Sequence, residues 1–102
     1  MPYFLVVLKA GPAADEEPRH ADAHVAFIDS LIERRLVFLG GDFSEPADGI
    51  SAAYLLHCGS IDEAKAIAAE DPYAIHDVCE TETVEWQLVG IDPELIDSNL
   101  VD

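Results

Sequence analysis

His24 and Asp71 are the two residues of this sequence whose side chains could transfer a proton together. His24 lies in the segment "AHVAFIDSLIERRL", and Asp71 lies in the later segment "EDPYAIHDV". An imidazole gains and loses a proton near neutral pH, and a neighbouring carboxylate fixes its tautomer and favours its charged form. The two residues therefore predict either a proton-transfer pair or a buried polar pair that only stabilises the fold.

Apolar periodicity predicts the strands that must position this pair. Short runs rich in β-branched and aromatic residues alternate with polar, Gly- and Pro-containing segments. The last run alternates apolar and polar residues, as a half-buried antiparallel strand does. The segments 10–18 and 44–49 are expected to be loops. The predicted strands are 2–9, 36–43, 50–58 and 78–90.

Two helices are expected between these strands. The first covers 19–35, because His24 and four apolar residues after it recur at helical spacing on one face. Arg34 and Arg35 would then lie in its last turn, near the negative end of the helix dipole. The second helix should begin at the capping box from Ser60 to Glu63 and end before Pro72. Pro72 favours an extended Asp71, and a short turn is expected over 73–77.

The resulting β-α-β-β-α-β order predicts an α+β, ferredoxin-like sandwich with both helices on one face of an antiparallel sheet. We expect residues 1–90 to form one domain and 91–102 an acidic tail, which either docks as a short helix or stays loose. The uncovered sheet face would be too apolar for a monomer, which favours a face-to-face homodimer. Cys58 and Cys79 fall on strands separated by the first strand, too far apart for a disulfide.

Composition excludes several functions. The chain has 21 acidic and 5 basic residues, a formal net charge of −16, so it should repel nucleic acids and anionic membranes. The acidity fits either a solvated acidic surface or adaptation to a salt-rich cytoplasm. No signal-peptide pattern or long apolar run is present, which predicts a cytoplasmic protein. No nucleotide-binding, serine-hydrolase or metal-ligand motif occurs, so neither a cofactor nor a metal is expected.

Several ordered segments resemble the YciI-like (YCII-related) family. They are "YFLVVLKAGP", "HVAFIDSLIERRLVFLGG", "SIDEAKAIAAEDPY" and "VEWQLV", and together they cover about residues 2–89. The resemblance implies a ferredoxin-like fold that forms dimeric α/β barrels. It also implies a site built from a His near the start of the first helix and an Asp before Pro and an aromatic residue, here His24 and Asp71. The wider superfamily includes muconolactone isomerase and a dehydrochlorinase for a chlorinated hydroxyhydroquinone, but most members have no assigned reaction.

The sequence departs from the family pattern at three places. Arg34 stands where a helix-terminating glycine is frequent, Gly41-Asp42 where Gly-Pro is common, and His76-Asp77 where small residues usually follow the aromatic residue. The last two departures could reshape the mouth of the pocket, so a relative's substrate cannot be assumed for this chain.

Four further residues are candidates for binding a substrate. Gly40 and Gly41 could let a ligand approach the backbone, or could only bend the end of a strand. Tyr73 is either a wall residue or hydrogen-bond donor of the site, or a core aromatic. His20, one helical turn before His24, either joins the site, forms a histidine pair or is an exposed residue of the first turn. His57 and His76 are expected at the surface. Whether an arginine anchors an acidic ligand is left open.

Two functions remain in competition. The first is a cofactor-independent acid–base enzyme, a lyase or isomerase for a small cyclic or unsaturated compound, in which His24 moves the proton and Asp71 orients it. The second is a non-catalytic, dimeric small-ligand-binding or accessory domain in which the pair is structural. A pocket beside His24 would favour the first function, and a closed, filled site the second.

Overall fold

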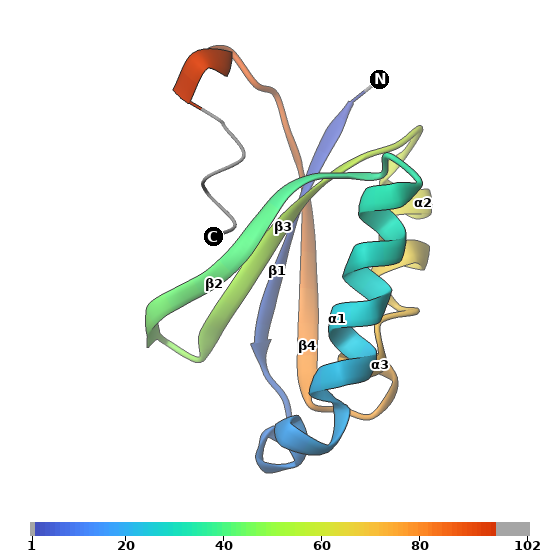
Figure 1. Cartoon of the computed structure of the whole chain (residues 1–102), viewed down its shortest axis with the longest axis vertical. Coiled ribbons are helices and arrows are strands. Elements are labelled where there is room, and N and C mark those ends of the chain that lie inside the picture. The colour runs from blue at the N-terminus through green and yellow to red at the C-terminus, as the bar shows by residue number, and fades with distance from the viewer. Residues whose placement is uncertain (1, 96–102) are drawn as a thin grey trace.

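The computed structural model describes residues 2–95 and confirms an α+β, ferredoxin-like fold (Figure 1). Four strands form one antiparallel sheet in the order β2-β3-β1-β4, the order expected for a split β-α-β arrangement. The strands are β1 (Tyr3–Ala10), β2 (Val37–Ala47), β3 (Ile50–His57) and β4 (Cys79–Trp86). The helices are α1 (Glu17–Glu33), α2 (Ile61–Ala68) and α3 (Pro72–Ile75), with short 3₁₀ turns η1 (Ala14–Glu16) and η2 (Pro93–Leu95).

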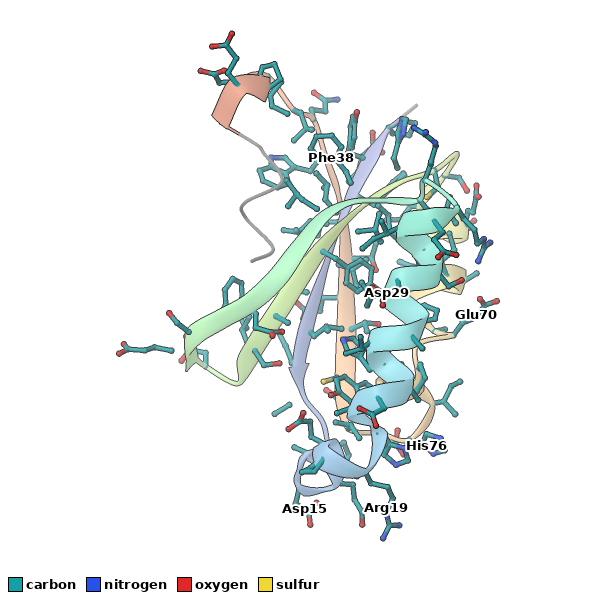
Figure 2. All side chains as sticks on the ribbon, viewed as in Figure 1. Asp15, Arg19, Asp29, Phe38, Glu70 and His76 are labelled. Atoms are coloured by element: carbon teal, nitrogen blue, oxygen red, sulfur yellow. The ribbon has the colours of Figure 1, made fainter. Side chains whose placement is uncertain are left out.

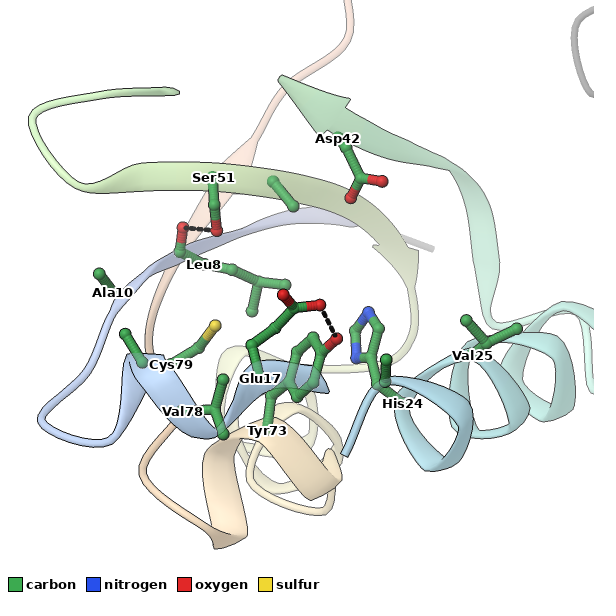
Figure 3. Close-up of a pocket in the computed structure, with 13 residues that line it drawn as sticks. Leu8, Ala10, Glu17, His24, Val25, Asp42, Ser51, Tyr73, Val78 and Cys79 are labelled. Carbon is green, nitrogen blue, oxygen red and sulfur yellow. Dashed lines mark hydrogen bonds between the residues drawn. The ribbon is translucent and has the colours of Figure 1, made fainter. Parts of the chain in front are cut away.

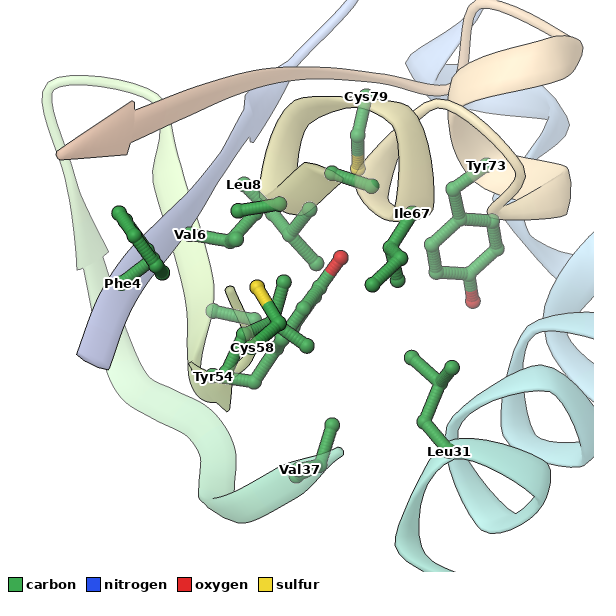
Figure 4. Close-up of a cluster of buried hydrophobic side chains, with 14 of the residues drawn as sticks. Phe4, Val6, Leu8, Leu31, Val37, Tyr54, Cys58, Ile67, Tyr73 and Cys79 are labelled. Carbon is green, nitrogen blue, oxygen red and sulfur yellow. The ribbon is translucent and has the colours of Figure 1, made fainter. Parts of the chain in front are cut away.

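The three α-helices lie on one face of the sheet and enclose the core against it (Figure 1). Residues of β1 alternate between buried and half-buried, so Phe4, Val6 and Leu8 point towards the helices. Leu31 is the one fully buried residue of α1, while Ile32, which periodicity placed on the core stripe, is 51% exposed. Figure 4 shows Leu31 and Tyr54 facing each other in this cluster of buried side chains.

The opposite face of the sheet carries a patch of apolar side chains, and no α-helix of residues 2–95 covers it (Figure 1). The strand register pairs Leu5 with Val84 and Tyr3 with Trp86, which places all four side chains on this face. Val84 is 54% exposed and Trp86 is 47% exposed. Phe38 contacts the ring of Tyr3 edge-on. We call this surface, defined by Tyr3, Leu5, Phe38, Val84 and Trp86, the open sheet face.

Helix α1 begins and ends two residues earlier than periodicity predicts. The N–H of Leu36 donates to the carbonyl of Leu31 and the N–H of Arg35 to that of Ile32, the pattern of a Schellman motif. Arg35 takes the left-handed conformation, with φ of +60°, that this motif requires. Arg34 and Arg35 therefore lie beyond the last turn, not in it. The terminus was misplaced because no glycine stands at the left-handed position.

Two other elements correct the sequence-based expectation. The segment 44–49 was predicted as a loop, but β2 continues to Ala47 and pairs with Ile50 across a turn formed by Asp48 and Gly49. Both turn residues have positive φ, as a two-residue hairpin turn requires. Because β2 is an edge strand, it tolerates polar residues and proline. In addition, Pro72–Ile75 forms the short helix α3 where a turn was expected.

The last strand is shorter than the sequence predicts, and only part of the segment that follows it is described. Strand β4 ends at Trp86 and not at residue 90. Of the tail, only the η2 turn is described, and residues 96–102 lie outside the described residues, so docking of the tail remains a prediction. No helix within the described residues is both long enough and apolar enough to cross a membrane. In Figure 2 Glu70 extends away from the fold on its helical side, and Asp15 lies at its lower end.

Candidate functional site

The structure brings His24 and Asp71 into direct contact. Nδ1 of His24 lies 2.8 Å from one carboxylate oxygen of Asp71 and 2.9 Å from the other. A carboxylate only accepts hydrogen bonds, so Nδ1 carries the proton and donates it. In the neutral ring, Nε2 is then left as an acceptor. Asp71 is fully buried, at 0% exposure, whereas the His24 side chain retains 15%. The pair is therefore open to solvent only on the histidine side.

Local structure fixes Asp71 in this position. Pro72 follows it, and the backbone of Asp71 is extended, with φ of −60° and ψ of 128°. Asp71 is the N-cap of α3, where its Oδ1 accepts a hydrogen bond of 2.9 Å from the N–H of Tyr73. The same carboxylate thus caps one helix and binds a histidine of another.

Tyr73 forms a wall of the site and also links it to α1. Its ring stacks on the imidazole of His24, with centroids 4.0 Å apart and planes 8° from parallel. Its hydroxyl donates a 3.0 Å hydrogen bond to Oε1 of Glu17. Burial, and secondarily this bond to Glu17, raise the pKa of Tyr73, so the phenol keeps its proton at physiological pH. Tyr73 is a buried member of the core cluster and also lines a cavity beside His24, and its role towards a substrate remains a prediction.

A cavity of about 480 Å³ opens beside His24 (Figure 3). Apolar side chains such as Leu8, Val25 and Val78 form most of its lining. A second cavity of about 490 Å³ also borders His24 and is lined by Gly40 and Gly41. In Figure 3 the ring nitrogen of His24 that is farther from the helix points into open space. The structure thus brings His24, Asp71, Tyr73 and the glycine pair into one region of the fold, and their roles as site residues remain predictions.

The two glycines have different physical roles. A Cβ at Gly40 would lie 2.8 Å from Cβ of Tyr54, its partner residue on β3. The absence of a side chain at Gly40 therefore lets the two strands approach closely at this pair. A Cβ at Gly41 would meet nothing within 4 Å. Gly41 is therefore the glycine that leaves free space for a ligand, whereas Gly40 serves the packing of the sheet.

The other histidines lie apart from His24. His20 does not line either cavity beside His24, and its ring stacks on that of His76, 4.1 Å away and 8° from parallel. His20 is half-buried, and whether it contributes to the site remains a prediction. His76 is exposed as expected, but His57 is half-buried because it stacks on Tyr3.

Sequence reasoning missed four polar residues that line the first cavity. They are Glu17, Asp42, Ser51 and Cys79. Burial, and then the charge of Asp71, raise the pKa of the Cys79 thiol, so it is a poor nucleophile at neutral pH. Cys79 and Cys58 are both free and buried. A signal was available only for Asp42, which follows the Gly-Gly pair and departs from the family pattern.

Cationic side chains are not part of the lining of these two cavities in the described part of the chain. Arg19 pairs with Glu16 at 3.3 Å, and Lys9 pairs with Glu82 at 2.8 Å. Arg19 extends from the lower end of the fold in Figure 2. Within residues 2–95, no group of three or more His, Cys, Asp or Glu side chains is placed to hold a metal ion. The polar groups that line the first cavity are therefore carboxylates, an imidazole, a phenol, a hydroxyl and a thiol.

Comparison with known proteins identifies the family and agrees with the fold. A family model of the YCII-related domain matches residues 1–87. The chain belongs to the YCII-related family. No curated protein sequence matches it significantly. Among solved structures, its fold is similar to that of 5-chloro-2-hydroxyhydroquinone dehydrochlorinase (TftG) from Burkholderia phenoliruptrix, in complex with 2,5-dihydroxybenzoquinone, with a TM-score of 0.68. The two chains are 19% identical, over 83% of this chain and 93% of TftG, so the likeness establishes the fold alone.

Proposed function

We propose that this YCII-related protein is a cofactor-independent acid–base enzyme of the lyase or isomerase type, acting on a small cyclic or unsaturated compound. His24 moves the proton, and Asp71 orients the imidazole. The observation that carries the proposal is the contact of Nδ1 with both oxygens of a fully buried carboxylate, beside a cavity that the same histidine lines. This contact leaves Nε2 as the nitrogen that exchanges a proton with substrate.

The activity named for TftG suggests which compounds to assay first. TftG is a dehydrochlorinase, and loss of hydrogen chloride from a ring requires removal of a proton and departure of chloride. A base at Nε2 supplies the first of these steps, and the apolar lining of the cavity suits a ring compound. Chlorinated hydroxyhydroquinones and unsaturated lactones are therefore the first compounds to assay.

The test compares three proteins on this set. Chloride release is measured by ion chromatography, and proton exchange at ring carbons by NMR in D₂O. General acid–base catalysis contributes roughly 10²–10⁴-fold to a rate, so His24→Ala should lower the turnover rate by a factor of at least about 10². The matched control, His57→Ala, removes a histidine that stacks on Tyr3 outside the two cavities and should retain activity. Full activity of folded His24→Ala would reject the proposed role.

A non-catalytic binding or accessory domain is the alternative, and the capping of α3 by Asp71 favours it. A carboxylate that satisfies a helix N-terminus has a structural role whether or not the histidine reacts. In that case His24→Ala should lower stability and leave no turnover to lose. A wild-type protein that turns over none of the compounds but binds them would support this alternative.

We also propose that the protein is a homodimer joined through the open sheet face, because this surface exposes apolar side chains from β1, β2 and β4. Light scattering after size exclusion should give twice the chain mass. Val84→Glu should yield a monomer, while Ile75→Glu, on the exposed side of α3, should remain dimeric. A monomeric wild type at 100 µM would contradict this assembly.

We further propose a cytoplasmic location, with which the two free thiols are compatible.

A further inference from the structure

The two cavities beside His24 adjoin each other, and together they are called the cleft. Five residues line both of them, and among these only His24 and Asp42 are polar. The combined lining is otherwise dominated by apolar side chains. The polar contacts of a ligand that lies against His24 are therefore set by very few groups.

The charged side chains that line the two cavities are all acidic. Glu17 and Asp42 line the first cavity, Asp29 and Asp42 line the second, and no lysine or arginine appears in either lining of the described chain. Glu17 already accepts the hydrogen bond of Tyr73. Asp42 makes no hydrogen bond or ion pair with the described side chains. In Figure 3 its carboxylate lies across the cleft from the imidazole of His24.

A second unpartnered group, the hydroxyl of Tyr54, lies in the core behind the cleft (Figure 4). Tyr54 lines the second cavity, is 3% exposed, and its hydroxyl has no hydrogen-bond partner within residues 2–95. Buried polar groups in proteins are nearly always satisfied, by protein, water or ligand. The Tyr54 hydroxyl is buried in the core, whereas the Asp42 side chain is exposed, so of these two groups Asp42 is the one that a ligand in the cleft can reach.

We propose that the cleft selects a ring compound that is uncharged or cationic and carries a hydroxyl or amino group, and that it rejects carboxylated rings. Asp42 is the specificity-determining residue. It accepts a hydrogen bond from the ring substituent and thereby places the ring beside Nε2 of His24, whereas an anionic substituent is repelled. This inference rests on the proposed function for the identity of the site, but it concerns binding and not turnover.

The experiment uses three probes that share one ring. They are hydroquinone, 2,5-dihydroxybenzylamine and 2,5-dihydroxybenzoate, which differ in charge from neutral to cationic to anionic. Dissociation constants are measured by NMR titration of the full chain at pH 7 and 0.15 M salt, without oxygen. We expect the neutral and cationic probes to bind at least tenfold more tightly than the benzoate.

Variants separate Asp42 from the general acidity of the chain. Asp42→Asn should reduce the preference against benzoate at least threefold. Glu33→Gln removes one exposed carboxylate that lines neither cavity and should leave the preference unchanged. Equal binding of benzoate and hydroquinone to the wild type, an unaltered preference in Asp42→Asn, or no binding of any probe at 10 mM would each overturn the inference. Turnover in the His24→Ala assay tests the proposed function independently of these affinities.

Discussion

Truncation of His24 and Asp71, singly and together, should show that the two side chains are strongly coupled. His24→Ala leaves the fully buried carboxylate with only the N–H of Tyr73 as its hydrogen-bond partner. Removing one partner of a buried charged pair costs about 3–5 kcal/mol. The His24 side chain is 15% exposed, so water can enter the space that it vacates. We therefore expect the lower end of that range, about 3 kcal/mol.

Asp71→Ala loses the same hydrogen bond and also the N-cap of α3. Loss of such a cap costs about 1 kcal/mol, and an unsatisfied imidazole N–H adds about 1–3 kcal/mol. If both single variants lose one shared interaction, the double variant should cost less than their sum. The difference should equal a hydrogen bond to a charged group, about 1.5–3 kcal/mol.

Urea denaturation at one protein concentration measures these free energies of unfolding, because the stability of a dimer depends on concentration. Thermal melting provides a second measurement, at roughly 4–8 °C per kcal/mol for a domain of this size. The matched control is His20→Ala, which removes a stacked histidine of the same helix that makes no hydrogen bond to the described side chains. A coupling energy under about 0.5 kcal/mol would refute the argument that geometry ties the pair together.

Gly40 and Gly41 should respond differently to alanine in urea denaturation. Gly40→Ala forces Cβ to within 2.8 Å of Tyr54 and should cost about 1–3 kcal/mol, whereas Gly41→Ala should be nearly neutral; equal effects would contradict the assignment. Tyr54→Phe should raise the free energy of unfolding by up to about 1 kcal/mol because the buried hydroxyl is unpartnered among the described residues, and a loss of stability would reveal a hidden partner. Burial raises the pKa of Tyr73 and Cys79, so these groups lose their protons at lower pH in the unfolded chain than in the folded one. The free energy of unfolding should therefore fall as pH rises above the ordinary thiol pKa of 9.0. Equal free energies of unfolding at pH 8 and pH 10.5 would oppose this. A melting series to 3 M KCl should raise the melting temperature steeply if the acidity is an adaptation to salt, and only slightly if it is a solvated surface.

The fold could be predicted because strand and helix periodicities are local. Where prediction failed, the local signal was weak or misleading. The end of β2 consists of polar, glycine and proline residues that are typical of loops, and only its edge position and hairpin partner make it a strand. Helix α3 spans four residues, fewer than any periodic window can detect. Helix α1 ends with Arg35 at the left-handed position, where glycine is the usual signal.

The site could be predicted only in part, for a related reason. His24 and Asp71 stood out because a histidine on an apolar stripe and an aspartate before proline are both distinctive in sequence. Glu17 and Asp42 are two of 21 acidic residues, and most acidic side chains lie on the surface. What distinguishes these two is the cavity that they line, and that depends on how α1 packs against the sheet. Such a contact depends on tertiary structure and produces no periodic pattern in the sequence.

The contacts between α1 and α3 explain why the imidazole is fixed before any ligand binds. Two parallel ring stacks join these helices, His24 on Tyr73 and His20 on His76, and each pair is 8° from parallel. The histidines of α1 are four residues apart, so they lie on one helix face and meet α3 together. The hydrogen bonds also form a closed circuit, because Asp71 holds both His24 and the backbone of Tyr73, while the hydroxyl of Tyr73 returns to Glu17 of α1. The plane and tautomer of His24 are therefore set by contacts within the protein, so ordering this residue would add little entropic cost to the proton transfer that we propose for it.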